Sequence, residues 1–152
     1  MVTRRVYEIT ATIKNAHRQL ILVTQSYALS INNEGLKQLL KYFVKHQEST
    51  IETIQGITMS SKLKLLNIWM DLFPLELEQK LLKNLEQSHI TSLEDWIDCV
   101  FNFKADIAKL YKACASVMTD PNMAEMFEKL ASFEDKNFEL IATRISEYQQ
   151  AS

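Results

Sequence analysis

The residues with the clearest potential for chemistry lie near the C-terminus of the chain. Glu134 and Asn137 interrupt an apolar stripe that runs through Met126, Leu130 and Ile141. Side chains three residues apart lie on one face of a helix, so this carboxylate and this amide are expected to face the core. Helical bundles place carboxylate and imidazole ligands of metal ions at the same spacing. Here an amide stands where the imidazole would be.

The three histidines of the chain do not complete such a ligand set. His17, His46 and His89 lie at other spacings. At 3.6 residues per turn, His46 and Glu48 project about 200° apart, so one metal site cannot readily use both. We interpret these two side chains as solvated. The chain also contains no Gly-rich phosphate loop, no Ser-His-Asp order and no CxxC pair, the motifs that would indicate several common activities.

The spacing of apolar residues predicts four long helices around these candidates. The first spans about 3–31, where apolar positions recur in steps of three and four. The second spans about 33–55 and is expected to end at Gly56, because glycine commonly follows a last helical turn. The third and fourth span about 92–118 and 121–148. Helices of this length can position side chains from distant parts of the sequence in one core.

The segment between the second and third helices is less regular. Pro74 divides it into two predicted short helices, 62–73 and 75–85, because proline lacks an amide donor and restricts the residue before it. The whole segment, 57–91, is long enough to carry the chain from one end of a bundle to the other. Bundles with one long crossover form a recognised class of four-helix fold.

Composition supports an all-α domain. Gly and Pro total only four of 152 residues, fewer than the turns of a sheet protein require. We therefore predict a single domain, 1–152, folded as an up-down four-helix bundle. Its helix pairs, 3–56 and 92–148, are joined by the crossover 57–91, which carries short helices.

A recurring pattern links the two halves of the chain. In the second half Lys104 stands seven residues before Tyr111, and Asp120-Pro121 then precedes the run LASFEDKN at 130–137. In the first half Leu20 stands seven residues before Tyr27, followed by a short polar turn and a second helix. The pattern indicates a helical hairpin used twice.

The second half resembles the ferritin-like superfamily, particularly rubrerythrin-type domains. That family places a Glu seven residues before a Tyr, then an Asp/Asn-Pro turn, then Leu-Ala-x-x-Glu-x-x-His. In this chain Lys104 replaces the first Glu and Asn137 replaces the His. In the first half the Glu-x-x-His position falls on Gln47 and Thr50, or with a one-residue shift on Glu48 and Ile51. The resemblance implies the fold.

The resemblance also implies a set of metal ligands that this chain has mostly lost. A di-iron or di-manganese site of this kind uses four carboxylates and two imidazoles. Glu134 keeps its place, Glu48 is the other candidate, and neither imidazole is present. Losing most of a ligand set should leave no site for a first-row metal. We therefore expect no catalytic residue, no metal and no cofactor.

Lys104 suggests what could take the place of a metal. If the family geometry holds, its ammonium points into the same interior space as Glu134, and a lone buried carboxylate would be costly. We hypothesise a Lys104–Glu134 ion pair with Asn137 hydrogen-bonded to it, and Gln47 as a fourth polar core residue. The alternative is that Lys104 extends to solvent and Glu134 lies at the rim of the stripe.

Charge and cysteine content exclude several partners and compartments. The net charge is −2 and no basic run is present, so nucleic acid is not an expected partner. Cys99 and Cys114 do not form a disulfide framework, which favours a reducing compartment. The N-terminus lacks the apolar core of a signal peptide, and the apolar run 20–31 is too short and polar to span a bilayer. We expect a cytoplasmic protein without a membrane partner.

Two functional hypotheses follow. The first is a non-catalytic ferritin-like module that contacts another protein or a second copy of itself as a homodimer. Its predicted contact surface is the apolar crossover, with Leu66, Trp69, Met70, Leu72 and Phe73. The alternative is a divergent di-iron or di-manganese protein in peroxide or iron handling, for which the metal ligands would be Glu48, Glu134 and either Glu52 or Asp106. Elemental analysis with an iron or manganese titration would discriminate between the two.

Overall fold

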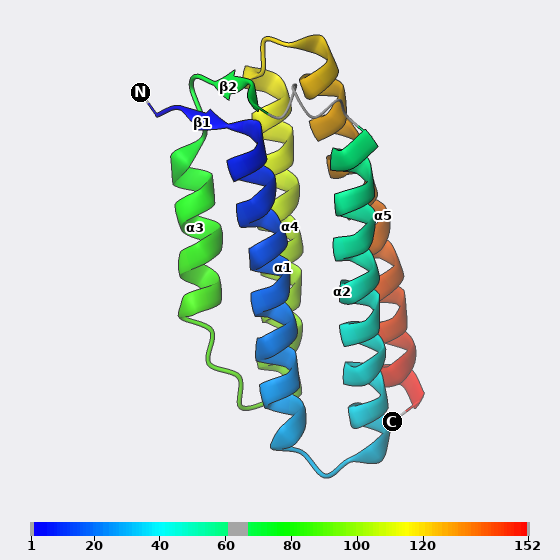
Figure 1. Cartoon of the computed structure of the whole chain (residues 1–152). Coiled ribbons are helices and arrows are strands. Elements are labelled where there is room, and N and C mark those ends of the chain that lie inside the picture. The colour runs from blue at the N-terminus through cyan, green and yellow to red at the C-terminus, as the bar shows by residue number, and fades with distance from the viewer. Residues whose placement is uncertain (1, 61–66, 152) are drawn as a thin grey trace.

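The computed structural model describes residues 2–60 and 67–151, and this part of the chain is all-α apart from a short two-stranded ribbon (Figure 1). The prediction of an all-α chain is therefore confirmed for these residues. The helices are α1 (Val6–Leu29), α2 (Glu34–Ser60), α3 (Leu75–Glu86), α4 (Leu93–Val117) and α5 (Pro121–Ala151).

The four long helices lie side by side and the short one flanks them (Figure 1). Helix α1 packs on α2, α2 on α5, and α5 on α4, while α1 also touches α4. Helix α3 packs against α1 and α4. Helix α3 carries the chain back to the end of the molecule where a loop joins α1 to α2. Helix α4 therefore starts at the same end as α2 and runs parallel to it (Figure 1). None of the described helices is long and apolar enough to cross a membrane.

Helix α2 does not end at Gly56, as its sequence predicts, but continues to Ser60. Gly56 is exposed, has no left-handed backbone angle, and a Cβ added there would meet nothing within 4 Å. It is therefore an ordinary interior glycine of a helix, tolerated at a cost of about 1 kcal/mol relative to alanine. The prediction over 75–85 is confirmed by α3, which is one residue longer.

The predicted helix over 62–73 is wrong where the structure describes it. Residues 61–66 lie outside the described residues, and Trp69–Met70 form strand β2, paired antiparallel with strand β1 (Arg4–Arg5). Backbone hydrogen bonds from Val6 N to Ile68 O (3.0 Å) and from Phe73 N to Val2 O (2.9 Å) extend the pairing. The N-terminal residues thus supply partners that no local pattern reveals, and α1 begins at Val6 instead of residue 3.

Helices α4 and α5 begin where polar side chains cap their free amides. The Ser92 hydroxyl accepts from Asp95 N at 3.1 Å at the start of α4, and Asp120 Oδ1 accepts from Met123 N at 3.0 Å at the start of α5. Much of the core between the helices is apolar, with Phe43 and Trp96 in edge-to-face contact at 5.1 Å.

Candidate functional site

A cluster of polar side chains lies inside the core, near the midpoint of each long helix. Helices α1, α2, α4 and α5 contribute His17, Gln47, Lys104 and Glu134 respectively, and all four are buried. Burial of so many polar groups is costly unless they are paired with one another. The cluster is therefore the feature of the interior that most needs a physical explanation.

Glu134 lies at the centre of the cluster because both of its oxygens face a basic group. Lys104 Nζ donates to Glu134 Oε2 at 3.4 Å. His17 Nε2 lies 2.8 Å from Glu134 Oε1. Lys104 and Glu134 are only 2% and 1% exposed, so Lys104 does not extend to solvent. The structure thus brings together the two residues that the sequence analysis paired.

The electrostatics of the cluster favour an ionised Glu134. Burial alone would raise the pKa of this carboxyl, but Lys104 and His17 outweigh burial and lower the pKa to about 2. Burial lowers the pKa of Lys104, and the carboxylate beside it opposes that change. Nearby, burial and then Lys104 lower the pKa of His46, while Glu134 acts in the opposite direction. Glu134 therefore stays ionised to a lower pH than an ordinary carboxyl, whereas Lys104 loses its proton more readily than an exposed lysine.

Further polar contacts surround the ion pair. His17 Nδ1 lies 2.8 Å from Gln47 Oε1. Asn137 Nδ2 donates to Thr50 Oγ1 at 3.3 Å, and Thr50 Oγ1 in turn donates to the His46 carbonyl at 2.9 Å. Asn137 was expected to bond to the Lys104–Glu134 pair, and this was wrong. One turn of helix beyond Glu134, its amide reaches α2 instead.

Three buried polar atoms near the cluster have no hydrogen-bond partner among the described residues: Tyr111 Oη, His46 Nδ1 and Gln47 Nε2. Burial, and to a lesser degree Glu134, raises the pKa of Tyr111 well above its usual value. The phenol therefore keeps its proton and is not a base at neutral pH. Buried groups of this kind are where internal water is commonly held.

The other predicted metal ligands lie away from Glu134 or are already engaged. Glu48 and Glu52 are exposed on α2. Asp106 is buried, but it accepts from Asn84 Nδ2 at 3.0 Å and lies 3.8 Å from Lys80 Nζ. Within residues 2–60 and 67–151, no three His, Cys, Asp or Glu side chains gather closely enough to hold a metal ion.

His17 is the member of the cluster that the sequence analysis missed. Apolar or small residues at Ala16 and Val23 fit the 3–4 spacing of the first helix, yet the structure leaves Val23 half-buried and buries His17 and Thr24, each one position further along. The steps Ile13, His17, Leu20 and Thr24 fit a helical face equally well. That second stripe was the sequence signal that could have identified His17 as buried. In the structure Thr24, on the same stripe, accepts a hydrogen bond from the buried Trp96 indole at 3.0 Å.

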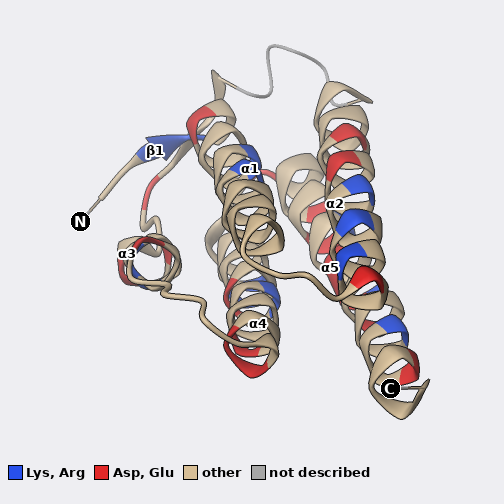
Figure 2. Ribbon diagram, turned by 90° about the horizontal axis from the view of Figure 1, so that it is seen from below, with Lys and Arg blue, Asp and Glu red and all other residues tan. Residues whose placement is uncertain are grey.

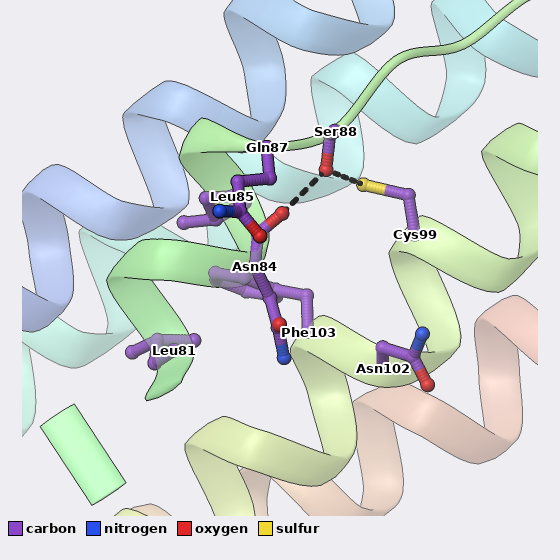
Figure 3. A pocket seen from close by; sticks show the side chains of 8 residues that line it. All are labelled: Leu81, Asn84, Leu85, Gln87, Ser88, Cys99, Asn102 and Phe103. Atoms are coloured by element: carbon purple, nitrogen blue, oxygen red, sulfur yellow. Dashed lines mark hydrogen bonds between the residues drawn. The ribbon is translucent and has the colours of Figure 1, made fainter. Parts of the chain in front are cut away.

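A small pocket of about 220 Å³ between α3 and α4 is a separate feature (Figure 3). Ser88 lies at its edge, where its hydroxyl donates to the Asn84 carbonyl at 2.8 Å and lies 3.3 Å from Cys99 Sγ. Burial raises the pKa of the Cys99 thiol, an effect that the Ser88 hydrogen bond only partly opposes. The thiol is thus less ionised than usual and poorly suited to act as a nucleophile.

The other cysteine is also inert. Cys114 is fully buried, and burial raises the pKa of its thiol to about 12.

No family model, no curated protein and no solved structure matches this chain. Its function must therefore be argued from the buried cluster and from the surfaces of the helices.

Proposed function

We propose that this chain is a non-catalytic helical module of ferritin-like architecture, whose own side chains occupy the interior space that relatives give to metal ions. The mutual packing of α1, α2, α4 and α5 supports a four-helix bundle. The position of α3 in the connection between the second and third long helices supports a crossover of the ferritin-like kind (Figure 1).

The observation that carries this proposal is the occupation of both Glu134 oxygens. The Lys104 ammonium lies 3.4 Å from one oxygen of the Glu134 carboxylate, and the His17 imidazole lies 2.8 Å from the other. A cation entering here would have to displace Lys104 and would find no second carboxylate among the described residues that surround it. Breaking a buried ion pair leaves an uncompensated charge and is strongly unfavourable. The cluster is therefore suited to holding helices together and poorly suited to holding iron or manganese.

A module without catalytic groups acts through its outer surfaces, by binding a protein partner or a second copy of itself. The crossover surface predicted from the sequence is smaller than expected, because Met70 and Phe73 are buried. Trp69 and Leu72 remain 51% and 61% exposed, and the Arg5 guanidinium covers the Trp69 ring at 4.7 Å. Leu66 lies outside the described residues. The exposed residues of the crossover are therefore too few to bind a partner by themselves, and the proposed role needs a larger apolar surface elsewhere on the molecule.

A metal titration tests the proposal directly. Purified wild-type protein titrated with Fe²⁺, Mn²⁺ and Co²⁺ under anaerobic conditions is expected to show no stoichiometric binding by calorimetry or elemental analysis. Tight binding of one or two ions per chain would overturn the non-catalytic reading.

A gain-of-function variant tests the ferritin-like architecture. The Lys104→Glu/Asn137→His double substitution restores the two side chains that the resemblance assigns to these positions. If the register is right, the variant should bind Co²⁺ with visible d–d absorbance, while wild type should not. A variant that folds by circular dichroism yet binds no metal would contradict the assigned register. Lys104→Gln/Asn137→His serves as the backup if the first double variant does not fold, because it removes the ammonium from Glu134, and weak Co²⁺ binding involving Glu134 is then expected.

A further inference from the structure

An open apolar groove runs between α1 and α2 near the loop that joins them. Its volume is about 380 Å³, and its lining includes Ala28, Leu29, Leu40 and Val44. Leu40 is buried and forms part of the floor, whereas Leu29 is 90% exposed at the end of α1. Leaving a large apolar side chain almost fully in water is unfavourable, so this end of the groove gains most from being covered.

A row of lysines forms one wall of the groove and extends beyond it. Lys37, Lys41 and Lys45 recur every four residues on α2, and the first two line the groove. Figure 2 shows the row as a run of blue along α2 with red on either side. Lys37 has a partner, Glu34 Oε1 at 3.7 Å, whereas no ion pair within the described chain involves Lys41 or Lys45. Like charges four residues apart on a helix repel one another.

We propose that this groove binds an acidic amphipathic helix of a partner protein. The apolar face of that helix covers Leu29, Leu40 and Val44, and its carboxylates at positions i, i+4 and i+8 meet the lysine row. Three such positions span about 12 Å, the same length as the lysine row, because both follow the rise of 1.5 Å per residue. Helix-in-groove recognition of this kind combines apolar anchors with flanking charges. The inference rests on the proposed role as an interaction module and names its partner by chemistry.

The geometry favours a helix over an anionic membrane. A membrane surface is flat and typically attracts clusters of four to eight basic residues, whereas this row has three lysines and is bounded by Glu34 and Glu48. The apolar residues lie in a concave groove and not on a protruding face, apart from Leu29. A rod-shaped ligand fits between two helices, and a flat one does not.

A designed peptide tests the proposal with wild-type protein. The probe is a labelled amphipathic helix of about 18 residues, long enough at 1.5 Å per residue to span the lysine row. It carries leucines at steps of three and four and glutamates at i, i+4 and i+8 beside them. The matched control peptide has glutamine in place of each glutamate. Fluorescence anisotropy should show binding of the acidic peptide, at least tenfold tighter than the control, and the difference should shrink as salt screens the charges.

Matched protein variants then locate the binding site. Lys41→Glu/Lys45→Glu should weaken the acidic peptide at least tenfold, and Leu29→Ser should weaken both peptides. Lys109→Glu/Lys136→Glu makes the same change in net charge at exposed lysines on α4 and α5, and it should leave binding unchanged. Equal binding of the two peptides, or equal loss in both pairs of variants, would overturn the proposal.

Other occupants give different outcomes, each of which overturns the proposal. Binding to phosphatidylglycerol vesicles without binding to the peptide would assign the groove to a membrane. A dimer in sedimentation that Lys41→Glu/Lys45→Glu dissociates would assign it to a second copy of the chain. The metal titration reports on the interior alone, so failure of the proposed function and failure of the groove assignment are distinguishable.

Discussion

The molecule treats its interior basic side chains and its α2 lysines in opposite ways. Inside, Lys104 and His17 face opposite oxygens of one carboxylate. Outside, Lys41 and Lys45 face no carboxylate within ion-pair distance in the described parts of the chain. An unpaired charge is prohibitively costly in the core and nearly free in water. Folding therefore requires that Lys104 and Glu134, if buried, be paired with each other, but it makes no such demand on the lysine row, which makes the row a better indicator of binding.

The largest effect should come from removing the shared interior carboxylate. Glu134→Gln leaves Lys104 buried without its counter-charge, and breaking a buried pair in this way costs about 3–5 kcal/mol of unfolding free energy. Urea denaturation at pH 7 measures the loss. The matched control is Glu125→Gln, which removes an exposed carboxylate 3.5 Å from Lys129. That change should cost no more than about 0.5 kcal/mol.

Replacing both charged partners sharpens the same test. Lys104→Met/Glu134→Leu removes the pair together, leaving His17 with its Gln47 contact. Buried ion pairs replaced by apolar side chains of similar volume are often neutral or stabilising. The double variant should therefore be markedly more stable than Glu134→Gln alone. If the two variants are equally destabilised, the pair contributes packing that charge cannot account for.

The next effect appears in acid. Glu134 has a folded pKa of about 2 against an ordinary value of 4.5, so the unfolded chain binds a proton before the folded chain does. Stability contributed by the ionised carboxylate is complete above pH 4.5 and is lost as the pH falls towards 2. This difference corresponds to about 3 kcal/mol. Urea unfolding between pH 6 and pH 2.5 should show the slope in wild type, and Glu134→Gln should lack that component. Identical slopes would contradict the assignment.

Much of the fold and part of the cluster followed from the sequence. The 3–4 spacing predicted the long helices, and the position of Lys104 relative to Glu134 suggested that the two could meet. His17 was missed because Ala16 and His17 lie on adjacent, equally plausible stripes, and only the rotation of α1 against its neighbours selects between them. Trp69–Met70 was read as helix because its strand partner, Arg4–Arg5, lies over sixty residues away in sequence. The hydrogen-bond partner of Asn137 was mispredicted for the same kind of reason, because it depends on how α5 is rotated towards α2.

The smallest effect concerns the lysine row. Lys41→Glu replaces two repulsions, with Lys37 and Lys45, by two attractions at i,i+4 spacing, each worth about 0.2–0.5 kcal/mol. The two repulsions lost and the two attractions gained should together make the variant more stable than wild type by about 0.8–2 kcal/mol at low salt, and high salt should reduce the gain. Thermal and urea unfolding at two salt concentrations measure it. Lys109→Glu is the control, because Ala105 and Ala113 stand four residues to either side.

Whether Lys41→Glu raises or lowers the free energy of unfolding shows whether the lysine row serves folding or binding. If Lys41→Glu destabilises the protein, the lysines are part of what holds α1 and α2 together, and the contrast with the interior cluster fails. If it stabilises the protein while weakening the acidic peptide, the row lowers stability in exchange for recognition. Surfaces used for binding commonly show this trade-off. The interior should show no such trade-off, since every substitution there that leaves a charge unpaired lowers stability.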